Sequence, residues 1–168
     1  GFSGLRYEDI LRVKNLTHDK KKNRYYFDVL TDKTEVRVKI PVMDKRIIEL
    51  YKKNKEQFNF NMANQTFNEC FKILGLRAKL TNKITKQYIN TSTNKPTKET
   101  FPYYTKLSSK VLRKTFASMM IRDFNLPLQV VMGWTGHTNE AIFKIYCNIT
   151  PSEYYEMSTA LLDKMKLI

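Results

Sequence analysis

Hydrophobic and polar residues follow two different periods along the chain, and together they predict a mainly helical domain with a small antiparallel sheet near its start. Residues 24–30 (RYYFDVL) and 35–42 (EVRVKIPV) are rich in tyrosine, phenylalanine and valine and are separated by TDKT, which indicates a β-hairpin. Residues 15–19 (NLTHD) are predicted to add a third strand. Pro41 suits the end of an edge strand rather than the centre of a sheet.

Apolar residues at helical spacing predict helices in most of the remaining chain. Asp44 is placed to cap one of them, and Gly75 is placed to end another. The apolar side of the helix before Gly75 is formed by Phe67, Cys70, Phe71 and Leu74, and that of the helix after Asp44 by Ile47, Ile48, Leu50 and Tyr51. The predicted helices cover residues 5–13, 44–54, 64–74, 108–124, 126–134, 139–148 and 151–168.

Residues 77–106 interrupt this pattern with a long stretch rich in lysine, threonine and asparagine. We expect a long excursion there, with a weak hairpin around residues 84–90 (ITKQYIN). Loops of this length are uncommon unless they have a function. A loop that faces DNA and a disordered loop both fit its lysines, which are Lys79, Lys83, Lys86, Lys95 and Lys98.

The composition indicates one folded, strongly basic domain. The chain has 168 residues, 42% of them hydrophobic, and its 10 Phe, 10 Tyr and 1 Trp argue against a disordered tail. Its 30 Lys and Arg against 16 Asp and Glu give a net charge of +14. A compact body with this charge repels itself unless a polyanion neutralises it, which favours nucleic acid first and an anionic membrane second. A solvated basic surface without a specific partner is the alternative.

Several classes of protein are disfavoured by what the sequence lacks. No apolar run approaches the roughly 18 residues of a membrane-spanning helix, and no signal peptide is visible. Cys70 and Cys147 are far apart and fit no metal-binding spacing, and two cysteines with two histidines leave no structural zinc site. No carboxylate cluster would hold two metal ions. We therefore expect no metal and no cofactor, in a reduced intracellular compartment.

Six residues stand in chemically suggestive settings, although each also has an ordinary structural interpretation. Arg6 follows shortly after a serine and a glycine, and Lys33 lies in a predicted hairpin turn. Lys110 and Arg113 are three residues apart and share one face of a helix. His137 and Tyr146 are nine residues apart. Taken singly they read as a turn, a solvent-exposed lysine, a basic helix face, and a histidine cap beside a core tyrosine. In chain order they are Arg6, Lys33, Lys110, Arg113, His137 and Tyr146.

Taken together, the segments around these residues resemble the catalytic signature of the tyrosine recombinases, the phage integrase family. The matching segments are SGLRYEDI, TDKTEVRVKIP, KVLRKTFAS and TGHTNEAIFKIY, in the family's order. The hairpin lysine lies eight residues before a strand-ending proline, and the tyrosine follows the last histidine by nine, as in the family. The resemblance covers essentially the whole chain and implies a single catalytic domain, residues 1–168, like that of a mobile-element integrase.

The resemblance implies metal-independent DNA cleavage and rejoining, in which Tyr146 attacks a phosphodiester and forms a 3′-phosphotyrosine. Arg6 and Arg113 would stabilise the negative charge of the transition state, and His137 would donate a hydrogen bond to a nonbridging oxygen. Lys33, on a mobile hairpin tip, would protonate the leaving 5′-oxygen. Asp9, one helical turn after Arg6, would either orient that arginine or merely contribute charge at a helix start.

Two departures from the family pattern are visible. Lys110 stands where the family usually has histidine, and a lysine, with an ordinary pKa near 10.4 against 6.5, accepts a proton less readily near neutral pH. Either a lysine suffices here, or activity is reduced. Family catalytic domains also begin with further helices before the first arginine and follow a core-binding domain, so we expect this sequence to be part of a longer protein.

The resemblance also implies the partners: double-stranded DNA and self-association to a tetramer on two duplexes, with no membrane and no small-molecule substrate. The expected location is the bacterial cytoplasm, at the nucleoid when DNA is bound. The C-terminal helix, residues 151–168, either packs on its own core or docks on a neighbouring protomer. Its apolar side carries Met157, Ala160, Leu161 and Met165.

Two alternative functions remain open from the sequence. A non-catalytic DNA-binding module is one, because residues 121–137 (IRDFNLPLQVVMGWTGH) resemble a helix-turn-helix. That interpretation explains the charge but leaves Arg6, Lys33 and Tyr146 as coincidence. A degenerate recombinase that binds DNA without cutting it is the other, and Lys110 makes it conceivable.

Overall fold

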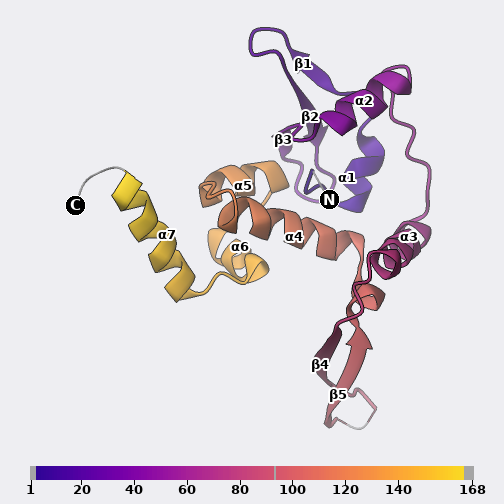
Figure 1. Cartoon of the computed structure of the whole chain (residues 1–168), viewed down its shortest axis with the longest axis vertical. Coiled ribbons are helices and arrows are strands. Elements are labelled where there is room, and N and C mark those ends of the chain that lie inside the picture. Colours follow the sequence, from indigo (N-terminus) through magenta and orange to yellow (C-terminus); the bar gives the residue numbers. More distant parts are fainter. Residues whose placement is uncertain (1–2, 93, 165–168) are drawn as a thin grey trace. The chain divides into compact units, whose positions relative to one another are not determined.

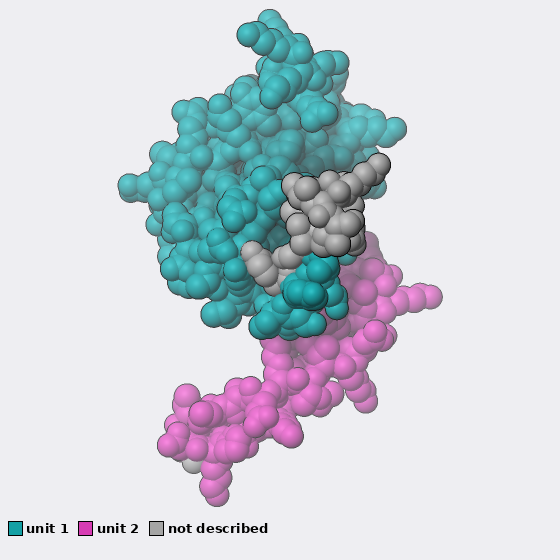
Figure 2. Space-filling model, turned by 90° about the vertical axis from the view of Figure 1, so that its left-hand side faces the viewer, with its two compact units in different colours: residues 1–60, 113–168 teal, residues 61–112 magenta. Residues whose placement is uncertain are grey.

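The computed structural model describes residues 3–92 and 94–164, which divide into two compact units (Figures 1 and 2). Residues 1–60 and 113–168 form the larger unit, and residues 61–112 form the hairpin unit. The predicted fold class is confirmed, because the chain is mainly helical with a three-stranded antiparallel sheet near its start. In the described part of the chain, no helix combines the length and the apolar character needed to cross a bilayer.

The sheet of the larger unit follows helix α1 (Tyr7–Arg12) and consists of β1 (Thr17–Asp19), β2 (Arg24–Leu30) and β3 (Arg37–Pro41), in the order β1-β2-β3. Alternate residues point to one side, as the period of two requires. Phe27 pairs with Ile40 and Val29 with Val38, and all four are buried. The predicted hairpin and third strand are therefore confirmed.

Helix α2 (Lys45–Lys53) completes this side of the unit, and its cap is the predicted Asp44, whose side chain accepts a hydrogen bond from the Arg46 N–H at 2.9 Å. Tyr51 is buried in the core beneath the sheet, and Ile47 packs against that core. Leu50, expected on the apolar side, is 55% exposed. Ile47 and Tyr51 are four residues apart and share the face of the helix that points to the core. Leu50 lies off that face and is therefore exposed to solvent.

Four helices build the second core of the larger unit: α4 (Ser109–Arg122), α5 (Leu128–Thr135), α6 (Glu140–Cys147) and α7 (Pro151–Lys164). The most deeply buried side chains of this core, at most 1% exposed, are Phe116, Ala117, Ile121, Val131, Phe143 and Cys147. From α7, Met157 packs against it. Met165 and the side chains of Ala160 and Leu161 lie outside the described residues.

The hairpin unit consists of α3 (Asn64–Arg77), β4 (Lys83–Ile89), β5 (Pro96–Pro102) and a 3-10 turn, η1 (Tyr103–Lys106), followed by the start of α4. The predicted excursion at 77–106 is thus an ordered two-stranded hairpin, not a disordered loop (Figure 1). Gly75 does not end its helix, which continues to Arg77. A Cβ at Gly75 would lie 2.4 Å from Leu107, so this glycine permits close packing instead. Cys70 is exposed rather than facing a core.

Gly4 has a structural requirement of its own in the larger unit. Its φ of +62° is a left-handed conformation that favours glycine, and a Cβ there would lie 2.3 Å from the ring of the buried Phe116 on α4. The glycine therefore lets the segment before α1 lie directly against α4. Gly133, in the middle of α5, has no such constraint, because a Cβ there would meet nothing within 4 Å among the described residues.

These two glycines give a matched test of the fold. Gly4→Ala is expected to lower the free energy of unfolding by about 2–4 kcal/mol, because it adds backbone strain to overpacking of a rigid ring. Gly133→Ala should leave that free energy unchanged or raise it by up to about 1 kcal/mol, because alanine favours an exposed helix interior. Denaturant unfolding of both variants measures the difference. Equal stability of the two variants would contradict the packing of Gly4 on Phe116.

Candidate active site

Arg113 lies at the centre of the candidate site, on helix α4, and is only 6% exposed. Its Nη1 donates to the Gly4 carbonyl at 2.7 Å, and its Nη2 donates to the Thr135 carbonyl. These bonds join the segment before α1 and the end of α5 to α4. Because a guanidinium has five N–H groups, up to three remain for another acceptor.

Arg6 immediately precedes α1, and its charge acts on Arg113. Burial lowers the pKa of Arg113, and the neighbouring charge of Arg6 lowers it further. The Nη1 atom of Arg6 lies 3.7 Å from Oδ2 of the fully buried Asp9, and neither atom has a hydrogen-bond partner among the described residues. Asp9 thus faces the predicted arginine and leaves one buried oxygen unsatisfied, which is uncommon in folded proteins.

His137 follows the left-handed cap of α5, Gly136, whose φ is +64°. Its Nδ1 lies 2.7 Å from the Thr135 hydroxyl, which itself lies 2.7 Å from the Val131 carbonyl. The single hydroxyl proton can go to either of these two acceptors. When it is donated to the Val131 carbonyl, the hydroxyl oxygen accepts from the Nδ1–H of His137. In that tautomer of the neutral ring, the proton is on Nδ1 and Nε2 carries the lone pair.

The environment keeps His137 uncharged. Burial, together with the charges of Arg113 and Arg6, lowers the pKa of its imidazole from 6.5 to about 4. A neutral histidine with Nδ1 protonated can accept a proton at Nε2 but cannot donate one there.

Tyr146 lies in the last turn of α6, and its ring centroid is 5.0 Å from that of His137. The nine-residue spacing thus brings the two rings together. Its hydroxyl is buried and has no partner in hydrogen-bonding geometry among the described residues. Burial raises the pKa of the phenol, and the charges of Arg113 and Arg6 oppose that rise. Tyr146 therefore shares one electrostatic environment with both arginines.

Lys33 lies, exposed, in the turn between β2 and β3. The neighbouring Asp32 N–H donates to Oδ1 of Asp9 at 2.8 Å, and the Thr34 hydroxyl donates to the Gly136 carbonyl at 3.4 Å. The turn is thereby attached both to the partner of Arg6 and to the residue before His137. The mobility expected of the hairpin tip remains a prediction.

Lys110 is the one predicted residue that belongs to the hairpin unit. It is exposed in the first turn of α4, three residues before Arg113. Its participation in the site remains a prediction.

The acceptors that hold Arg113 and His137 were not predicted from the sequence, although Gly4 was noted beside Arg6. Thr135 supplies the carbonyl for Arg113 and the hydroxyl for His137, and Gly4 supplies a second carbonyl. The sequence TGH shows a threonine two residues before the histidine. A threonine is also common at the end of a helix, so its position alone did not assign it to the site. Backbone acceptors carry no residue-specific signal at all.

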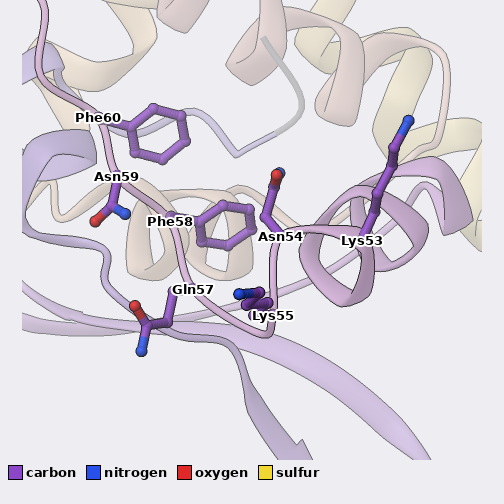
Figure 3. Close-up of a pocket in the computed structure, with 7 residues that line it drawn as sticks. All are labelled: Lys53, Asn54, Lys55, Gln57, Phe58, Asn59 and Phe60. Atoms are coloured by element: carbon purple, nitrogen blue, oxygen red, sulfur yellow. The ribbon is translucent and has the colours of Figure 1, made fainter.

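Two pockets in the described part of the chain lie away from the candidate site. Residues 53–55 and 57–60 line a pocket of about 420 Å³, where the ring of Phe60 stacks on that of Phe58 with 5.4 Å between the ring centroids (Figure 3). A second pocket, of about 650 Å³, lies between Tyr25, Trp134 and Phe124. Neither pocket is lined by any of the six predicted residues. Among the described residues, no group of three or more His, Cys, Asp or Glu could hold a metal ion.

Comparison with solved structures finds a similar fold in the crystal structure of XerA recombinase, with a TM-score of 0.58 and 17% sequence identity. The match covers 95% of this chain and 54% of that chain, so this chain spans about half the length of the recombinase. No protein-family model matches the sequence, and no curated protein matches it. The similarity therefore concerns the fold.

The depressed pKa of His137 predicts a pH dependence of stability. Between pH 6.5 and about 4 the unfolded chain binds a proton at this residue that the folded chain does not, so stability falls as the pH is lowered. From pH 7 to pH 5 the loss should be on the order of 1–2 kcal/mol, since solvent screens a half-buried ring.

Denaturant unfolding at both pH values tests this expectation. His137→Gln should remove this part of the loss, whereas His18→Gln, which changes an exposed histidine, should retain it. An unchanged pH dependence in His137→Gln would show that the ring is not held neutral by its surroundings.

Proposed function

We propose that this chain is the catalytic domain of a site-specific DNA recombinase, or integrase, that cleaves and rejoins DNA through a 3′-phosphotyrosine. The observation that supports it best is the convergence of Arg6, Arg113, His137 and Tyr146, which come from segments far apart in the sequence. The fold similarity to XerA recombinase is consistent with the same reaction class.

The two arginines suit a phosphodiester as the ligand. The transition state of phosphoryl transfer concentrates negative charge on the nonbridging oxygens, and guanidinium groups can each donate two hydrogen bonds to such oxygens. Arg113 is already oriented by two carbonyls, so binding a phosphate costs it little side-chain entropy. Arg6 brings an Nη1 group that has no hydrogen-bond partner among the described residues.

The tyrosine hydroxyl is the proposed nucleophile. Its oxygen attacks the phosphorus, the bond from phosphorus to the 5′-oxygen breaks, and the protein becomes joined to the 3′-phosphate. The phenol proton moves to Nε2 of His137, which is an acceptor in the tautomer whose Nδ1–H donates to Thr135. The resulting imidazolium then donates to a nonbridging oxygen, the role expected for this histidine. Because one phosphoester replaces another, the step is reversible and rejoining needs no external energy.

Two lysines complete the proposal. Lys33 protonates the leaving 5′-oxygen from a turn that Asp9 and Gly136 hold in place. Lys110, in place of the usual histidine, adds a cation to the phosphate rather than a base. With His137 available as the base, a lysine at position 110 is compatible with activity.

The proposed substrate is double-stranded DNA, on which four copies would assemble. The C-terminal helix would either pack on its own core, as Met157 of α7 does, or dock on a neighbouring protomer. A helix-turn-helix function for residues 121–137 is less compatible with the fold. Helix α5 contains no lysine or arginine, and its Leu128, Val131 and Met132 are buried in the core. A recognition helix needs polar side chains free to reach base edges.

The nucleophile is tested with nicked suicide DNA substrates and the full-length protein. Wild-type protein should form a covalent protein–DNA adduct, and Tyr146→Phe should form none, because it lacks the attacking oxygen. Tyr103→Phe is the matched control, since this tyrosine of η1 is exposed, belongs to none of the proposed sites, and should leave adduct formation unchanged. An adduct that persists in folded Tyr146→Phe would sink the assignment of the nucleophile.

Arg6 is tested by the rate of adduct formation at saturating DNA. Arg6→Gln should reduce this rate by about 10²–10³-fold, the effect of removing one donor to a developing oxyanion. Arg37→Gln removes an equal charge from the sheet, where the arginine pairs with Asp28 at 2.7 Å, and should change the rate less than about threefold. Similar rates for the two variants would mean that Arg6 does not contact the reacting phosphate.

A further inference from the structure

The β4–β5 hairpin has two chemically different faces. Cross-strand partners share a face in an antiparallel pair, and the register joins Thr85 with Thr100 and Gln87 with Lys98. A contact of 3.0 Å between the two threonine hydroxyls agrees with this assignment. We define the polar face by its exposed polar residues, which are Lys83, Thr85, Gln87, Lys98 and Thr100.

The opposite face is occupied by contacts within the hairpin unit. Glu99 accepts a hydrogen bond from the Tyr88 hydroxyl and lies opposite Lys86 in the register. At the base of the hairpin, Phe101 is half-buried, and the Lys106 ammonium lies 3.3 Å from its ring centroid. This face therefore combines an apolar base with one carboxylate opposite one lysine.

Charge is distributed unequally between the two faces and along the chain. Residues 61–112 carry nine lysines and arginines against two glutamates, so they hold +7 of the net charge of +14. Glu99 is the sole acidic residue between positions 83 and 102, and it lies on the face opposite the polar face. The polar face thus presents two lysines, an amide and two hydroxyls without any carboxylate.

A two-stranded ribbon with such a face has the dimensions and chemistry of a DNA-reading element. The major groove of B-form DNA admits a two-stranded β-ribbon, and base edges there are read by amide and hydroxyl side chains. Lysines at the same surface neutralise phosphates. An isolated two-stranded hairpin is also only marginally stable in water, so a partner along one face would stabilise it.

We propose that the polar face binds the groove of duplex DNA, with Lys83 and Lys98 on phosphates and Gln87, Thr85 and Thr100 toward base edges. Ile89, 64% exposed at the end of the same face, is suited to apolar contact with a thymine methyl group. This inference rests on the proposed action on DNA but assigns a contact surface separate from the residues that would perform the chemistry.

Single substitutions in the full-length protein test the face. Lys83→Gln, Lys98→Gln and Lys86→Gln each remove one positive charge, and Lys86 lies on the opposite face. The probe is a random-sequence 40-base-pair duplex, with affinity measured from about 50 to 200 mM salt. Lys83→Gln and Lys98→Gln should each weaken binding about fivefold to tenfold at 0.1 M salt and reduce the salt slope by about 0.9. Lys86→Gln should change affinity less than about twofold.

Equal effects of all three substitutions would overturn the proposal, because only net charge would then matter. Unchanged DNA binding together with weaker self-association in sedimentation would also overturn it, and would make this face a protein contact. Adduct formation at saturating DNA separates this proposal from the proposed function. Normal adducts with unaltered affinity in Lys83→Gln and Lys98→Gln would refute the hairpin contact alone. The predicted affinity losses without any wild-type adduct would refute the catalytic function and leave the DNA-binding face supported.

Discussion

A buried cation is the constraint on which the candidate site depends. Removing a guanidinium from water costs several kcal/mol unless hydrogen bonds compensate it. Arg113 obtains that compensation from the carbonyls of Gly4 and Thr135. Carbonyls free to accept occur where the backbone leaves regular structure, and these two lie at a left-handed glycine and at the last residue of a helix. The fold thus brings the carbonyls of these two irregular positions to the side chain of Arg113.

The turn that carries Lys33 is also attached to the site through a carbonyl at a left-handed glycine. Gly136 ends α5 with a left-handed residue, and its carbonyl accepts from the Thr34 hydroxyl. Its Cα lies so close to the turn that an added Cβ would be 3.3 Å from Thr31. From the other side, Asp9 accepts from the backbone of Asp32. The turn that carries Lys33 is therefore held by Asp9, which faces Arg6, and by Gly136, which precedes His137. A substitution at Asp9 or Gly136 should therefore also change the position of Lys33.

What could be predicted from the sequence was local. The hairpin turn around Lys33 and the pairing of His137 with Tyr146 depend on turn residues and helix spacing, both of which are visible in the sequence. The partners of Arg113 were not predictable, because every residue has a carbonyl and only the fold decides which one is near. Gly75 was assigned to a helix end because glycine usually stands there. Its actual reason, the approach of Leu107, is a contact between residues 32 positions apart.

The charges that would bind the substrate also control the proposed base. In the free protein Arg113 and Arg6 add to the effect of burial and hold His137 neutral, while burial keeps the Tyr146 phenol protonated. A phosphate bound between the two guanidiniums would cancel much of their field, since opposite charges within about 4–6 Å favour the charged form of a neighbouring base. The pKa of His137 would then rise when the phenol needs a proton acceptor. On the proposed mechanism, the arginines therefore act as binding groups whose charge opposes protonation of His137 less once the phosphate is bound, while the effect of burial remains.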